Sequence, residues 1–206
     1  MADGHRSVRS RTREAILDAA ASAFRELGFD GTSMDEIARR AGVARGTLYY
    51  NFPSKDDIAV QIAERYRAEG YSRLLAQQAA GEDALALLDN FFAFAGEWIV
   101  ENRDAAFIGT TAAIRGVGRS PDRPGTTSVF EGLVLQGQTE GTFRRDLPAP
   151  AIARLLAALL SQAALLGPNI SNGEAAQWPR HLLRMALQGV LARAEGQDPL
   201  RGGSYR

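Results

Sequence analysis

The chain of 206 residues contains no cysteine and only two histidines, His5 and His181, which lie far apart in the sequence. Without cysteine there can be no disulfide bond, no thiolate nucleophile and no cysteine-ligated metal. Neither histidine has a serine nucleophile in a recognisable setting, and no P-loop is present. Gly116-Val117-Gly118 follows an expected helix, whereas a nucleotide-binding fingerprint follows a strand. We therefore expect no catalytic residue, no metal, no cofactor and no enzymatic activity.

The chain also lacks an excess of charge of either sign, because 24 Lys and Arg residues balance 24 Asp and Glu residues. A zero net charge gives no overall argument for nucleic-acid binding. Residues 1–55 carry nine basic and seven acidic residues, a charge of +2, and residues 56–206 carry 15 and 17, a charge of −2. This small basic excess weakly favours the N-terminal end as the part that faces DNA.

No hydrophobic run is suited to a membrane. The most apolar stretch, residues 152–166, is short, contains Arg154 and is followed by Gly167-Pro168, so it predicts a buried core helix. The N-terminus is basic, but Asp18 interrupts the apolar stretch that follows, which is not the pattern of a signal peptide. We expect a cytoplasmic protein without a membrane partner.

Strand-like alternation is absent from residues 56–206, where apolar residues recur at helical spacing. Glycine and proline clusters separate the helical segments. The sequence therefore predicts an all-α fold. The helices that we expect after Pro53 lie at residues 54–79, 82–101, 104–117, 122–139, 148–167 and 175–195.

Three shorter segments at the N-terminus have the spacing of a helix-turn-helix. A helix is expected from about Ser10 to Leu27, ended by Gly28, with Phe29 folding back onto it. Ser33 or Thr32 then caps a second helix that ends at Gly42, and a third helix covers about residues 44–51. The apolar positions predict a core of Ile16, Ala20, Phe24, Ile37, Ala38, Val43, Leu48 and Phe52.

A small helical bundle without DNA binding would give the same core. The other face of the third helix argues against it, because Arg45, Thr47, Tyr49 and Tyr50 crowd hydrogen-bonding groups into less than two turns. Such groups suit the base edges and phosphates of DNA.

From about Arg13 to Lys55, without a gap, the sequence closely resembles the DNA-binding domain of TetR-family transcription regulators. The matching stretches are residues 15–20, Phe24, 26–29, 32–34, 37–38, 41–43, 46–50, Phe52 and 54–55. The resemblance implies a helix-turn-helix DNA-binding domain in residues 1–55 and a helical ligand-binding and dimerisation domain in residues 56–195. From their composition we expect residues 196–206 to form a disordered tail.

The resemblance also places the third helix in the major groove of operator DNA. Arg45 is then the best base reader, since its fork can bond guanine O6 and N7, and contact with phosphate alone is the alternative. Thr47 and Tyr49 can reach bases or thymine methyl groups, although Tyr49 could instead be partly buried against the first helix. Gly46 leaves room for close approach to DNA. The expected phosphate contacts are Tyr50, Asn51, Ser33, Thr32 and Lys55.

Aromatic residues crowd one later helix. Phe91, Phe94 and Trp98 recur at helical spacing, which is typical of a core but also of a pocket for an apolar or amphipathic effector. The residues that we expect to line such a pocket are Phe91, Phe94, Trp98, Phe107, Thr111 and Phe130. The sequence does not choose between core and pocket.

The last two helices carry apolar stripes that could pack within one chain or form a four-helix interface between two chains, as in TetR-like dimers. The interface candidates are Leu155, Leu159, Ala163, Leu182, Ala186 and Gly189. The expected protein is therefore a homodimeric, ligand-released repressor on a palindromic operator of double-stranded DNA. A helical binding or adaptor protein without operator binding is the alternative, and activation instead of repression stays open.

Overall fold

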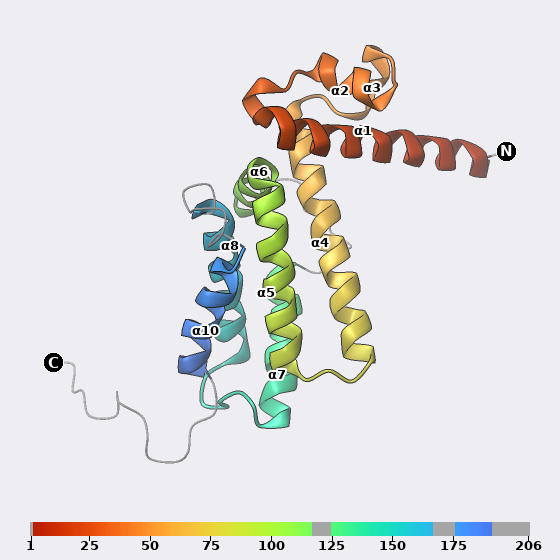
Figure 1. The fold of residues 1–206 in the computed structure, drawn as a ribbon. Helices are drawn as coiled ribbons and strands as arrows, with labels where there is room; N and C mark the ends of the chain where they lie inside the picture. The colour runs from red at the N-terminus through yellow and green to blue at the C-terminus, as the bar shows by residue number, and fades with distance from the viewer. Residues whose placement is uncertain (1, 117–124, 167–175, 191–206) are drawn as a thin grey trace.

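The computed structural model describes residues 2–116, 125–166 and 176–190, and these ranges form nine helices (Figure 1). At one end, α1 (Ala2–Gly31) lies across the molecule beside α2 (Met34–Ala41) and α3 (Arg45–Asn51). The long helix α4 leaves this end and runs alongside α5. The remaining helices complete the other part: α4 (Lys55–Ala79), α5 (Ala84–Glu101), α6 (Arg103–Ile114), α7 (Thr126–Glu140), α8 (Ala149–Leu166) and α10 (Trp178–Val190). The all-α prediction is confirmed.

The predicted core of the N-terminal unit, α1–α3, is present. Of its eight predicted residues seven are buried, and Val43 is half-buried against the same core. The core also includes Ile58 and Ile62 of α4 and Ala105 of α6. The N-terminal unit is therefore packed onto two helices of the following part, α4 and α6.

The first helix is longer than predicted. It begins at Ala2 instead of about Ser10, because extending an existing helix needs no apolar face once the packed part has formed it. The predicted break lies at Gly28, whose backbone is non-helical (φ 74°, ψ 162°), and a further short stretch reaches Gly31. Phe29 packs against Phe24, with 5.1 Å between ring centroids, as expected for a residue that folds back.

The later helices lie at the predicted places, and every predicted end that falls within the described residues is within two residues of the observed one. The other five predicted ends, at residues 117, 122, 167, 175 and 195, lie outside the described residues, as does the tail at 196–206. The largest core joins α5, α7 and α8 around Phe92, Phe130 and Leu156. Leu74 of α4 also belongs to it, so α4 contributes to the cores of both parts of the molecule.

Among the described helices, α8 is long and apolar enough to cross a membrane by length and composition, with 33% of its residues buried. It packs against α5, α6, α7 and α10. Its remaining surface includes two exposed apolar side chains, Leu155 and Leu166.

Candidate DNA-binding surface and ligand cavity

The α2–α3 turn is built from local signals. Ser33 caps α2, because its Oγ accepts a hydrogen bond from the Glu36 N–H at 3.1 Å. Gly42 ends α2 in the left-handed region (φ 65°), where a side chain would be strained. In α3, Leu48 is fully buried. The position of Leu48 fixes which face of α3 points to solvent.

The exposed face of α3 carries the predicted DNA-contacting groups at the end of the molecule farthest from α7 (Figure 1). Arg45, Gly46, Thr47, Tyr49 and Tyr50 are all exposed, and a Cβ at Gly46 would meet no atom within 4 Å. Tyr49 is 41% exposed, and the Arg45 guanidinium lies 5.5 Å from the centre of its ring. Tyr49 therefore shares the solvent-facing surface with Arg45.

Arg45 also pairs with the first turn of α2. Its Nε lies 3.2 Å from Asp35 Oδ1, and both side chains are mostly exposed, at 66% and 62%. An exposed pair of this kind contributes little to stability, so a phosphate or a base can replace it.

The prediction that Thr32 contacts phosphate is wrong. Thr32 is only 1% exposed, and its hydroxyl donates to the Gly28 carbonyl at 2.8 Å. The kink in α1 leaves this carbonyl without its helical partner, and Thr32 supplies the replacement. Ser33, the next residue, is exposed and keeps its place at the edge of the surface.

Asn51 and Lys55 both have partners within the chain. The Asn51 amide donates to the Thr47 carbonyl at 2.8 Å. The Lys55 ammonium donates to the Phe29 carbonyl at 2.6 Å and lies 4.5 Å from the centre of the Phe29 ring. Lys55 stands in the first turn of α4, as expected, and its ammonium has two further N–H donors.

Two arginines of α2 form a network of ion pairs beside this surface. Arg39 and Arg40 both bond Glu36, which lowers the pKa of that carboxyl from 4.5 to about 2. Arg40 also reaches Glu26 of α1 at 2.8 Å. Glu36 and Glu26 together balance the two arginines, and Arg39, whose side chain is 70% exposed, lies on the solvent side of this network.

A cavity of about 280 Å³ lies in the other part of the molecule, between α4, α5, α6, α7 and α8. Its walls are mostly apolar or aromatic, with a group of polar side chains on α4. The main lining residues are Glu64, Tyr66, Arg67, Tyr71, Phe91, Ala95, Trp98, Ile99, Ala106, Thr110, Ile114, Thr126, Leu160 and Ala164.

Of the six predicted pocket residues, Phe91 and Trp98 line this cavity and four do not. Phe130 is fully buried in the core, edge-on to Phe91. Phe107 is 45% exposed on α6, and the Thr111 hydroxyl bonds its carbonyl at 2.9 Å. Phe94 belongs to a separate hollow between α4 and α5. Helical spacing grouped these side chains by face but could not tell which neighbouring helix covers each one.

The prediction missed the contribution of α4. Tyr66 stacks on Trp98 and on Phe94, with ring centroids 4.1 and 4.5 Å apart. Burial raises the pKa of its phenol well above the usual range, and the phenol oxygen has no hydrogen-bond partner among the described residues. Tyr71 is also largely buried, and its hydroxyl bonds Thr126 at 2.7 Å. The apolar face of the fourth helix, which includes Tyr66, was the available signal.

The predicted dimer face is partly internal. Ala163 and Leu182 are buried in a core of their own chain with Ile99 and Ala106, so these two predictions are corrected. Each lies on the side of α8 or α10 that meets its neighbours in the chain. Leu155 is 45% exposed, Leu159 and Ala186 are half-buried, and Gly189 lies outside the residues whose burial the structure describes.

Comparison with known proteins assigns the chain to a family. The profile of bacterial regulatory proteins of the tetR family matches residues 16–62, which cover the helix-turn-helix and the start of α4. The transcriptional repressor BepR of Brucella suis is 30% identical over 166 residues, which are 73% of this chain and 78% of the repressor. The chain belongs to the tetR family. It is therefore a DNA-binding transcription regulator, as its sequence predicts.

The likeness of this TetR-family regulator to its relatives extends beyond the DNA-binding domain. The A-factor receptor protein of Streptomyces griseus is 31% identical over 191 residues, 88% of this chain, but the match spans only 66% of the receptor's length. The crystal structure of Thermus thermophilus FadR, a TetR-family repressor in complex with lauroyl-CoA, superposes with a TM-score of 0.66. It is 25% identical and covers 93% of this chain and 100% of FadR.

Proposed function

We propose that this regulator is a homodimeric repressor in the cytoplasm that binds a palindromic operator and leaves it when a small apolar or amphipathic molecule fills the cavity. The observation that carries the proposal is the exposed face of α3, with Arg45, Thr47, Tyr49 and Tyr50 opposite the buried Leu48. An α-helix fits the major groove, and these side chains reach base edges and phosphates.

The roles on DNA follow from position. Arg45 reads guanine through its fork, and Thr47 and Tyr49 contact neighbouring bases. Tyr50, Asn51 and Ser33 hold phosphates and thereby set the register, without reading sequence. Lys55 adds a phosphate contact through the N–H donors that Phe29 does not use.

A second copy of the chain would cover the exposed apolar side chains of α8 and α10. Leu155 and Leu166 of α8 and Met185 of α10 are 45%, 38% and 58% exposed. Two helices from each chain form a four-helix interface with two-fold symmetry. The same symmetry sets two α3 helices against two half-sites of a palindrome.

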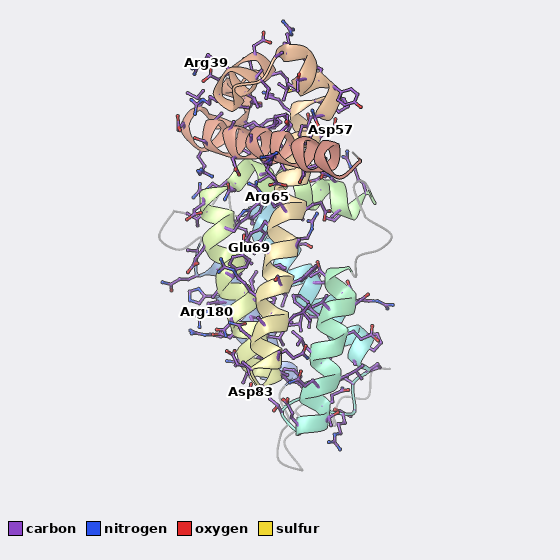
Figure 2. All side chains as sticks on the ribbon, turned by 90° about the vertical axis from the view of Figure 1, so that its right-hand side faces the viewer. Arg39, Asp57, Arg65, Glu69, Asp83 and Arg180 are labelled. Carbon is purple, nitrogen blue, oxygen red and sulfur yellow. The ribbon has the colours of Figure 1, made fainter. Side chains whose placement is uncertain are left out.

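The cavity is connected to DNA binding through α4 and α6. At 1.5 Å per residue the 25 residues of α4 span about 37 Å. The helix begins at the N-terminal unit and ends close to the start of α5 at Ala84. Arg65 of α4 bonds Glu14 and Asp18 of α1, and Figure 2 shows it directly beneath α1. At α6, Asp104 accepts the Phe29 N–H at 3.0 Å. A molecule that moves α4 relative to α6 therefore moves α3.

Hydroxyl-radical footprinting on the DNA around the gene tests this function. We expect two protected half-sites related by two-fold symmetry, about one helical turn or somewhat more apart. Protection of a single asymmetric site by a monomer would contradict the proposal. Once an effector is known, its affinity for the protein can be measured with and without saturating operator DNA. Operator DNA must weaken effector binding by the same factor by which the effector weakens operator binding. An effector affinity that operator DNA leaves unchanged would disprove the coupling.

A further inference from the structure

The charged groups of the cavity lie on one wall. Glu64 and Arg67 lie one turn apart on α4 and form an ion pair, and the side chain of each is 22% exposed. Tyr71 lies one turn further along α4. Its hydroxyl bonds Thr126 and interacts electrostatically with both Arg67 and Glu64. The facing walls are mostly apolar, with Phe91, Ala95, Ile99, Leu160 and Ala164, and also carry the hydroxyls of Thr110, Thr127 and Ser161. The cavity thus has one charged side, on α4, and facing walls that are mostly apolar.

The charge on the α4 wall is balanced. Among the described lining residues, Glu64 and Arg67 are the ones with a charged side chain, and they neutralise each other. A carboxylate that reaches Arg67 meets the like charge of Glu64, and an ammonium that reaches Glu64 meets Arg67. Repulsion of this kind is strong in a half-buried place, where water screens it less.

Arg67 can still serve as a hydrogen-bond donor. Its guanidinium has five N–H groups, and Glu64 is bonded through Nη2. A neutral carbonyl oxygen accepts such a bond without adding a charge. The apolar part of the molecule that carries this carbonyl can then cover Phe91 and Leu160. This contact is favourable because it removes apolar surface from water.

We infer that the cavity selects neutral amphipathic molecules, with a carbonyl or amide oxygen at Arg67 and Tyr71 and an apolar chain along Phe91 and Leu160. The Glu64–Arg67 pair is the charge filter. This inference rests on the proposed function only in treating the cavity as the effector site.

The filter can be altered by one atom. Glu64→Gln keeps the shape of the side chain but leaves the positive charge of Arg67 uncompensated, so the variant favours an anion. Glu69→Gln is the matched control. Glu69, labelled on α4 in Figure 2, pairs with Arg73 on the same helix, and neither residue lines this cavity. Both variants lose one carboxylate from an exposed or half-exposed pair of α4, which separates local charge from a general effect.

The experiment titrates the full-length protein, without DNA, with octanamide, octanoate and octylammonium in a calorimeter. We expect the wild type to bind octanamide about tenfold more tightly than either ion, a difference of about 1.4 kcal/mol. In Glu64→Gln, octanoate affinity should rise about tenfold. Glu69→Gln should keep the wild-type ranking.

Three results would overturn the inference: no binding of octanamide, equal or tighter binding of either ion to the wild type, or no rise of octanoate affinity in a Glu64→Gln protein that is folded by circular dichroism. Because no DNA is present, these results are independent of operator binding. The footprint can fail while the charge ranking holds, and the reverse can also occur, so the two proposals are tested separately.

Discussion

The close approach of α4 and α6 allows the coupling of cavity and DNA to be tested without any ligand. Gly109 of α6 is buried against α4, and a Cβ at this position would overlap the Cβ of Ala63. Gly109→Ala therefore forces the two helices apart. Methyl carbons pack at about 3.5–4.0 Å, so we estimate a separation of roughly 1.5 Å.

The length of α4 magnifies this displacement at the DNA. Ala63 lies roughly 24 Å from Ala79 and roughly 12 Å from Lys55 along the helix axis. If α4 tilts about its Ala79 end, its Lys55 end moves by roughly 2 Å, and in a dimer the distance between the two α3 helices changes by roughly 4 Å. The spacing of the half-sites is fixed, so contacts at one half-site are lost.

We predict that Gly109→Ala weakens operator binding about 5- to 150-fold, which corresponds to a coupling of about 1–3 kcal/mol. Fluorescence anisotropy of a labelled operator measures this, with circular dichroism to confirm the fold. The control is the double variant Ala63→Gly with Gly109→Ala, which moves the methyl group to the other helix and should restore affinity. Ala63→Gly lowers helix propensity and Gly109→Ala raises it by a similar amount, so the two effects on helix stability nearly cancel.

A folded Gly109→Ala protein with wild-type affinity would refute the argument. A double variant that stays as weak as the single one would show that separation of α4 from α6 is not the cause of the loss.

Three further variants test other parts of the account. Leu155→Arg should give a monomer in light scattering, because the interface would bury an unpaired charge at a cost of several kcal/mol, whereas Leu75→Arg on exposed α4 surface should leave the dimer intact. Lys55→Ala should reduce the slope of log affinity against log salt by about one per subunit, and an unchanged slope would restrict Lys55 to its bond with Phe29. Tyr66→Phe should raise the stability by about 1 kcal/mol, because it removes a phenol that lacks a partner among the described residues. This corresponds to about 2–4 °C in the melting temperature, and Tyr71→Phe, which loses its bond to Thr126, should lower it.

The helix-turn-helix was predictable because its signals are local. The Ser33 cap, the turn at Gly42 and the apolar spacing around Ile37 and Leu48 each act within a few residues, and all four have the predicted place in the structure. Thr32 shows the limit of such signals. The sequence marks it as a polar residue at a helix start, but the free carbonyl that it bonds arises from the kink at Gly28.

The cavity was less predictable because it depends on contacts between distant segments. The spacing of Phe91, Phe94 and Trp98 predicts an apolar face on α5 but does not say which helix covers it. In the structure, α4 brings Tyr66 and Arg67 to that face. Only the packing of α4 against α5 distinguishes the residues that line the cavity from those that belong to the core. The same holds for Ala163. Its apolar face of α8 would suit an interface between two chains, but in the structure Ala163 is buried in a core of its own chain.

Reading of DNA by α3 is the central claim, and it is tested most directly by selecting random duplexes with the wild type and with Arg45→Ala. The account predicts a palindrome for the wild type. For the variant it predicts lost preference at one base position in each half-site, with a cost of about 1–3 kcal/mol at that position. An enriched sequence that is identical for both proteins, with affinity reduced equally for all duplexes, would contradict base reading by Arg45 and restrict it to phosphate contact.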